Sequence, residues 1–148
     1  MRQISAERSM PVSRSAVWSV LADFPNIADW NGGVATSFAT SEAVSGVGAR
    51  RHCDLSPTGE LEESVREWEP ESRMVISIDS AKKLPLRSGL VTFLLDDDNG
   101  HSRTRIDYRY TTKWGVLGAL LGPMLDGQLR KGFAGFLADL EAEAAKRA

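Results

Sequence analysis

The sequence predicts an α+β fold in which a curved antiparallel sheet of seven strands wraps around one long C-terminal helix. Three observations support this prediction: one strand and two short helices come first, about six strands follow in succession, and a long amphipathic helix comes last. Helices segregated from consecutive antiparallel strands are typical of α+β proteins. The 148 residues fit one domain, 1–148, which is large enough to fold without a disulfide or a metal.

The N-terminal segment predicts a strand followed by two short helices. Residues 2–10 alternate between apolar and polar, with Arg8 as the charged residue on the apolar face. Ser13 is a suitable N-cap for a first helix, and a second short helix is expected over 26–30. We expect Arg8 to be paired or to reach solvent; the alternative is that it holds a ligand carboxylate.

The middle of the chain, from residue 34 to about residue 112, reads as strands separated by turns, with a loop expected over 82–87. The clearest alternation lies in 103–112, where four charged residues share one face and Tyr108 and Tyr110 share the other. This pattern indicates a sheet with one face in water and one face toward the interior.

The C-terminal segment predicts a long helix that packs on the sheet. Pro123 fits the first turn of this helix, or else it kinks a helix already begun at Gly115. Three glycines fall inside it, and they either leave volume for a ligand or allow close packing on the sheet: Gly127, Gly132 and Gly135. Apolar residues at intervals of three and four form the face expected on the sheet, namely Leu125, Leu129, Phe133, Phe136 and Leu140.

Composition narrows the possible functions. The chain has 18 basic and 20 acidic residues, a net charge of −2, which argues against a nucleic-acid binder and against a polybasic membrane anchor. A single cysteine, Cys53, excludes an internal disulfide, and with two histidines we expect no metal site and no cofactor. The sequence shows no signal peptide and no apolar run long enough to span a bilayer. We therefore expect a cytoplasmic monomer or homodimer without integral membrane association.

A predicted hairpin brings candidate polar groups together. If its turn, 56–59, has four residues, His52 lies opposite Glu63 and Arg50 shares their face, whereas a three-residue loop would reverse this. Such a cluster can anchor a ligand carbonyl or act as a general acid or base. A structural ion pair near the sheet edge is the simpler interpretation, and the same register places Cys53 on the outer face.

Several short sequence motifs follow one another along the chain: residues 10–18, Asp23 with Trp30, and residues 46–50, 61–65 and 115–118. In their order and spacing they resemble those of the START-like helix-grip (SRPBCC) superfamily, which includes the major birch-pollen allergen. The chain is most similar to its polyketide cyclase/dehydrase and lipid-transport families. The resemblance implies a helix-grip fold around a cavity, with Glu63 matching a glutamate that tends to face the pocket, but it implies no particular activity.

Three functions are compatible with this resemblance. The first is binding of a small hydrophobic or amphipathic molecule, such as a lipid, polyketide or similar ring compound, in a cavity of a few hundred Å³. The alternatives are a polyketide cyclase or dehydratase, with Glu63, His52 and Tyr108 as candidate catalytic residues, and a regulatory or toxin-type interaction protein with a collapsed pocket. The predicted ligand-binding residues are Trp30, Arg50, Glu63, Ile106, Tyr108, Tyr110, Leu121, Met124, Leu125 and Phe136.

Overall fold

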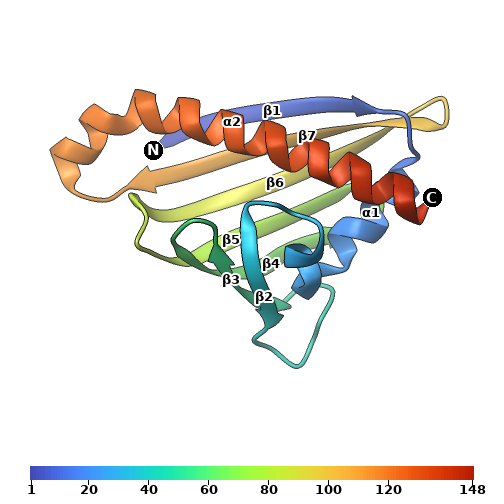
Figure 1. Ribbon diagram of the computed structural model, residues 1–148, viewed down its shortest axis with the longest axis horizontal. Coiled ribbons are helices and arrows are strands. Elements are labelled where there is room, and N and C mark those ends of the chain that lie inside the picture. The colour runs from blue at the N-terminus through green and yellow to red at the C-terminus, as the bar shows by residue number, and fades with distance from the viewer.

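The computed structural model describes residues 1–148 and consists of a curved seven-stranded sheet with a long helix lying across it (Figure 1). The strand order is β1-β7-β6-β5-β4-β3-β2, and every neighbouring pair is antiparallel. This confirms the α+β class, the seven strands and the predicted order of elements. The elements are β1 (Arg2–Met10), α1 (Arg14–Ala22), the 3-10 helix η1 (Phe24–Asp29), β2 (Val34–Ala39), β3 (Arg50–Leu55), β4 (Glu60–Glu69), β5 (Arg73–Lys82), β6 (Leu86–Asp98), β7 (His101–Thr112) and α2 (Gly115–Arg147).

The N-terminal elements follow the predicted pattern. The Ser13 hydroxyl caps α1 by accepting a hydrogen bond from the Ala16 backbone amide at 3.1 Å. Arg8, on the apolar face of β1, is partly exposed, and its Nε donates to Oε1 of Glu141 on α2 at 3.1 Å. The arginine is therefore paired within the chain, and it ties the first strand to the last helix.

The loop expected over 82–87 shrinks to residues 83–85, because β5 and β6 extend into it from both sides. Gly89 explains why the sequence pattern hid the start of β6. Glycine usually marks a break in a strand pattern, yet a Cβ at Gly89 would lie only 2.6 Å from Cε1 of Tyr108. The missing side chain gives the tyrosine ring its place on the inner face of the sheet.

Helix α2 is continuous from Gly115 to Arg147, so Pro123 lies inside it and the second of the two predicted alternatives is correct. Its 33 residues span about 50 Å at 1.5 Å per residue. Figure 1 shows that it runs along the whole length of the sheet and changes direction early in its course. No helix of the protein is both long enough and apolar enough to cross a membrane.

The glycines of α2 fall into two groups with opposite surroundings. A Cβ at Gly118 would lie 1.9 Å from the backbone oxygen of Lys113, so this position requires glycine for close packing. In contrast, a Cβ at Gly127, Gly132 or Gly135 would meet no atom within 4 Å. The interpretation of these three glycines as close-packing residues is therefore wrong.

This contrast predicts opposite effects of alanine on stability. We expect Gly118→Ala to lower the free energy of unfolding by about 1–3 kcal/mol, because the added methyl overlaps a backbone oxygen. We expect Gly135→Ala to raise it by about 1 kcal/mol, because alanine favours helix and finds open space. Urea unfolding of both variants measures this, and equal effects of the two substitutions would contradict the packing described.

Candidate ligand-binding pocket

A pocket of about 290 Å³ lies between the inner face of the sheet and the middle of α2. Strands β3 to β7 form its floor, the η1–β2 connection forms one side, and α2 residues 128–136 cover it. Fifteen of its 21 lining residues are hydrophobic, so an apolar molecule would gain free energy there by leaving water. Its volume is at the lower end of the range for small-molecule sites.

Aromatic rings form much of the pocket wall. Tyr108 meets Phe133 edge to face with ring centroids 5.3 Å apart, and Phe93 lies 5.6 Å from Phe136. Trp30 packs behind Phe136, at 5.1 Å, and is not itself part of the lining. These rings offer flat apolar surfaces, which suit a planar ligand.

A buried ion pair provides most of the charge in the pocket. Arg51 Nε donates to Glu63 Oε1 at 3.0 Å, and both side chains are more than nine-tenths buried. A second guanidinium nitrogen donates to the backbone oxygen of Phe24 at 2.9 Å, and the guanidinium lies 4.0 Å from the centroid of that ring. The second oxygen of Glu63 makes no hydrogen bond within the chain. That oxygen is thus the carboxylate atom left for a ligand.

Tyr108 carries a buried hydroxyl with no hydrogen-bond partner in the chain. Burial, together with the nearby charge of Glu63, raises the pKa of Tyr108 far above its ordinary value. The hydroxyl is therefore neutral and able to donate at any physiological pH. Buried polar groups usually have a hydrogen-bond partner. The Tyr108 hydroxyl has none in the chain, so it is free to donate a hydrogen bond to a ligand in the pocket.

The neighbouring Tyr110 is different, because its hydroxyl donates to Asp126 on α2. Asp126 is also paired with Arg2 at 2.7 Å. Burial and the hydrogen bond to Asp126 raise the pKa of Tyr110 to about 12. Tyr110 is thus a structural residue that joins β7 to α2, and it does not line the pocket.

The β3–β4 hairpin has a three-residue loop, 56–58, so the predicted register is wrong. The Leu55 amide donates to the Gly59 oxygen at 2.8 Å, which makes Gly59 part of the ladder. Gly59 has a φ of 118°, a value that glycine readily adopts and other residues avoid. Arg51 consequently lies opposite Glu63, and His52 opposite Glu62.

This register moves three predicted residues to the other face. Arg50 is exposed and His52 lies on the outer face, so neither reaches the pocket. Cys53, expected outside, is buried and lines the pocket, with its thiol 3.4 Å from Glu63 Oε1. Burial, reinforced by the charge of Glu63, raises the pKa of Cys53 to about 12, so the thiol is a poor nucleophile. The predicted register did not place Arg51 in the pocket, whereas the alternative with a three-residue loop would have done so.

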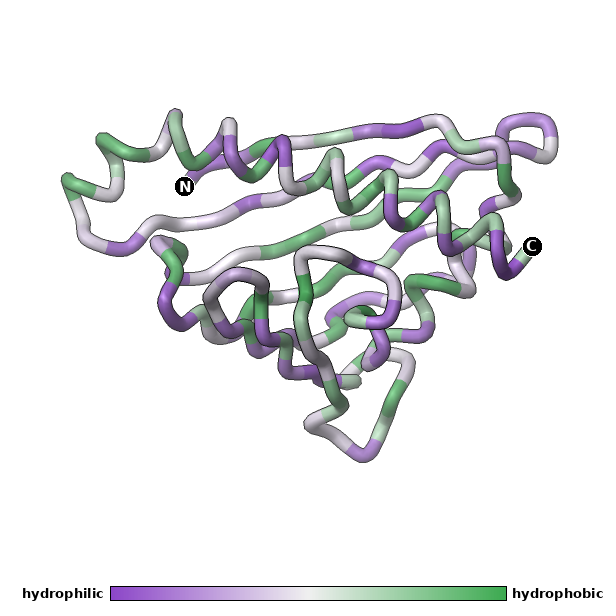
Figure 2. The backbone as a smooth tube through the Cα atoms, in the orientation of Figure 1, coloured by the Kyte–Doolittle hydropathy of each residue, from purple (hydrophilic) through white to green (hydrophobic).

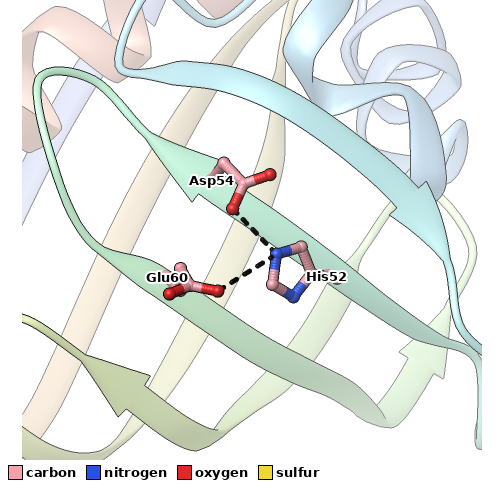
Figure 3. A group of neighbouring side chains, drawn as sticks. All are labelled: His52, Asp54 and Glu60. Atoms are coloured by element: carbon pink, nitrogen blue, oxygen red, sulfur yellow. Dashed lines mark hydrogen bonds and ion pairs between the residues drawn. The ribbon is translucent and has the colours of Figure 1, made fainter.

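On the outer face, His52 is surrounded by carboxylates (Figure 3). Its Nε2 lies 2.9 Å from Asp54 Oδ1 and 3.9 Å from Glu60 Oε1, and its Nδ1 is hydrogen-bonded to Glu62. The hydrogen bonds to Glu62 and Asp54 raise the pKa of His52. His52, Asp54 and Glu60 are close enough to hold a metal ion. However, both ring nitrogens are already hydrogen-bonded to carboxylates, and these hydrogen bonds favour the protonated ring. The absence of a metal site therefore stays a prediction.

Three of the ten predicted ligand-binding residues, Glu63, Tyr108 and Phe136, line the pocket. Met124 is exposed, and Ile106, Leu121 and Leu125 are buried or half-buried outside the lining. Leu121, Met124 and Leu125 precede the turns of α2 that cover the pocket, residues 128–136. The main residues that were missed come from the inner faces of the strands and from the β5–β6 loop, namely Leu61, Ile76, Ile78, Leu84, Leu86 and Val91.

Solved structures share this arrangement across nearly their whole length. A START superfamily protein from Mycobacterium smegmatis is 12% identical, with 99% of each chain covered and a TM-score of 0.82. The protein TTHA0849 from Thermus thermophilus is 15% identical, with 98% of each chain covered and a TM-score of 0.81. The protein Ara h 8.0201 is 12% identical, with 98% of each chain covered and a TM-score of 0.78. These identities are low, so the likeness establishes the fold alone.

The sheet, the gripping helix and the short helices after β1 form the helix-grip fold that the START superfamily protein also has, as the sequence motifs predicted. The chain belongs to the family described as polyketide cyclase / dehydrase and lipid transport, whose model matches residues 1–145. No curated protein matches the chain by sequence at a significant level.

The two stacked tyrosines, Tyr108 and Tyr110, predict a matched pair of stability effects. Tyr108→Phe removes a hydroxyl that has no partner, so we expect the free energy of unfolding to change by less than about 1 kcal/mol. Tyr110→Phe removes a hydrogen bond to a charged group, so we expect a loss of about 2 kcal/mol. Denaturant unfolding of the two variants measures this. A larger loss for Tyr108→Phe than for Tyr110→Phe would be incompatible with the hydrogen bonds described.

The His52 cluster predicts a pH-dependent contribution to stability. Because its pKa is raised on folding, His52 stabilises the fold fully below its unfolded pKa, and this contribution is lost as the pH rises through the folded pKa. We therefore expect His52→Gln to lower stability more at about pH 6 than at about pH 9. His101→Gln, at an exposed position at the start of β7 without an ion pair, is the matched control. A loss independent of pH would contradict the charged network.

Proposed function

We propose that the chain is a binding domain for a compact amphipathic molecule with a planar apolar body and one hydrogen-bonding group, held between the sheet and α2. One observation carries this proposal: an apolar pocket of about 290 Å³ contains a buried tyrosine hydroxyl without a partner. The family description, which includes polyketide cyclases and lipid transport, supports a ligand of this kind. The cytoplasm is the compartment that we expect from the sequence.

The size of the pocket favours a ring compound over a lipid with two acyl chains, because the volume is at the small end for ligand sites. The aromatic wall, formed by Phe93, Tyr108, Phe133 and Phe136, would stack on such a ring. A hydroxyl or carbonyl on the ring would bond to Tyr108 or to the free oxygen of Glu63. A ligand without that group would leave the tyrosine unsatisfied, so the polar contact mainly adds selectivity.

Binding is better supported than catalysis. Tyr108 has a pKa far above neutrality, so it can donate a hydrogen bond but cannot serve as a base. Cys53 is protonated for the same reason, and Glu63 is held by Arg51. His52, the remaining catalytic candidate, lies on the outer face of the sheet. A cyclase would therefore have to act through Glu63 alone.

The test compares naphthol with naphthalene, two planar ligands that differ by one hydroxyl. We expect the wild type to bind naphthol about five- to tenfold more tightly, and Tyr108→Phe to abolish this preference while still binding naphthalene. Leu129→Trp, which fills the pocket from α2, should weaken both ligands. Fluorescence titration measures the affinities.

Ala134→Trp is the matched control, because Ala134 is exposed on the same helix and is not part of the lining. It should leave both affinities unchanged. The proposal fails if the folded wild type binds neither ligand, or if Leu129→Trp and Ala134→Trp weaken binding equally. If Tyr108→Phe keeps the preference for naphthol, the Tyr108 hydroxyl does not bond to the ligand.

A further inference from the structure

The first turns of α2 present their large apolar side chains outward. Residues 116, 117, 120 and 124 fall within an arc of about 100° on a helical projection. The opposite side of these turns is buried and contains Gly118 and Gly122, which allow close contact with Lys113 and Arg2. An ordinary surface helix has the reverse arrangement. Together with the preceding tryptophan, these residues form the apolar tip, each more than half exposed: Trp114, Val116, Leu117, Leu120 and Met124.

The apolar tip adjoins a loop with free positive charge. The Lys113 amide donates to the Pro85 oxygen at 3.0 Å, and its Nζ donates to the Ala81 oxygen at 2.6 Å, so the β5–β6 loop is fastened to the start of α2. Figure 1 shows both at the same end of the molecule, and Figure 2 shows hydrophobic residues along the outer turns of the helix there. The basic loop consists of Lys82, Lys83 and Arg87, all exposed and none in an ion pair.

Basic residues predominate in the two segments that form this surface. Residues 80–95 and 108–125 contain five basic residues and no acidic residue, although the whole chain carries a net charge of −2. Glu60 lies across from Lys82 and on the same face of the sheet, and the charge of Lys83 acts on Asp54, so the carboxylates of the His52 cluster border the basic loop on the side of β3 and β4. A mixed surface of exposed tryptophan, aliphatic side chains and unpaired cations is complementary to the surface of an anionic bilayer.

We propose that the apolar tip and the basic loop form a docking surface for an anionic phospholipid bilayer. The apolar side chains enter the boundary between headgroups and acyl chains, while the lysines and the arginine contact lipid phosphates. The surface is continuous with the pocket, because Leu84 and Leu86 in and beside the basic loop line it. Docking therefore brings the pocket close to the membrane without any spanning segment.

A second copy of the chain is the competing occupant, and charge disfavours it. In a twofold dimer the same patch is used on both subunits. Two apolar tips in contact would then bring two basic loops together, and the like charges of Lys82, Lys83 and Arg87, none of which is in an ion pair, would repel.

The test is flotation of the full-length protein with vesicles of phosphatidylcholine, alone or mixed with phosphatidylglycerol. We expect the wild type to float with the mixed vesicles at low salt, and less at high salt because ions screen the lysines. Leu117→Ser/Leu120→Ser and Lys82→Glu/Lys83→Glu should each weaken binding roughly tenfold or more. Both pairs are exposed, so their folds should persist, which melting curves and naphthol binding in the pocket verify.

Val44→Ser/Val47→Ser is the matched control, because it removes two exposed apolar residues from the β2–β3 connection and should leave flotation unchanged. The proposal is overturned if the wild type does not float with mixed vesicles at low salt, or if the control pair weakens flotation as much as the tip variants. It is also overturned if the tip variants only convert a dimer into monomers. Naphthol binding without flotation would reject the docking surface and leave the pocket proposal standing.

Discussion

The ion pair between Arg51 and Glu63 is the interaction on which the shape of the pocket depends. Neither charge is stable alone in apolar surroundings, and removing one partner of a buried pair costs about 3–5 kcal/mol. Arg51 also reaches the Phe24 oxygen and covers its ring, so the pair fastens β3 and β4 to η1. That connection holds the η1–β2 segment over the floor of the pocket and places one free carboxylate oxygen among apolar walls.

The element order and the first helix cap were predictable because they depend on local patterns, such as Ser13 and the alternation around Tyr108. The β3–β4 register was not, because it depends on whether Gly59 belongs to the turn or to the strand. Successive strand residues point to opposite faces, so a register slip of one residue exchanges the two sets of side chains. Here it exchanged Arg51 for His52, and with them a pocket group for an outer-face group.

The composition of the pocket was only partly predictable for a related reason. Pro123 is compatible with either the start or the interior of a helix, and the sequence does not choose between them. In the structure α2 is continuous through Pro123 and residues 128–136 cover the pocket, so Phe136 lies there whereas Met124 lies in solvent. Glu63 was placed correctly because its match to a family motif did not depend on the hairpin arithmetic.

The centre of α2 combines inward aromatic contacts with three outward glycines. Phe133 and Phe136 contact Tyr108 and Phe93. The Cβ positions of Gly127, Gly132 and Gly135 face open space, with no atom within 4 Å. Each glycine also weakens the helix by roughly 1 kcal/mol relative to alanine. Three glycines in one stretch therefore make the part of α2 that covers the pocket intrinsically less stable than a helix with alanine at these positions.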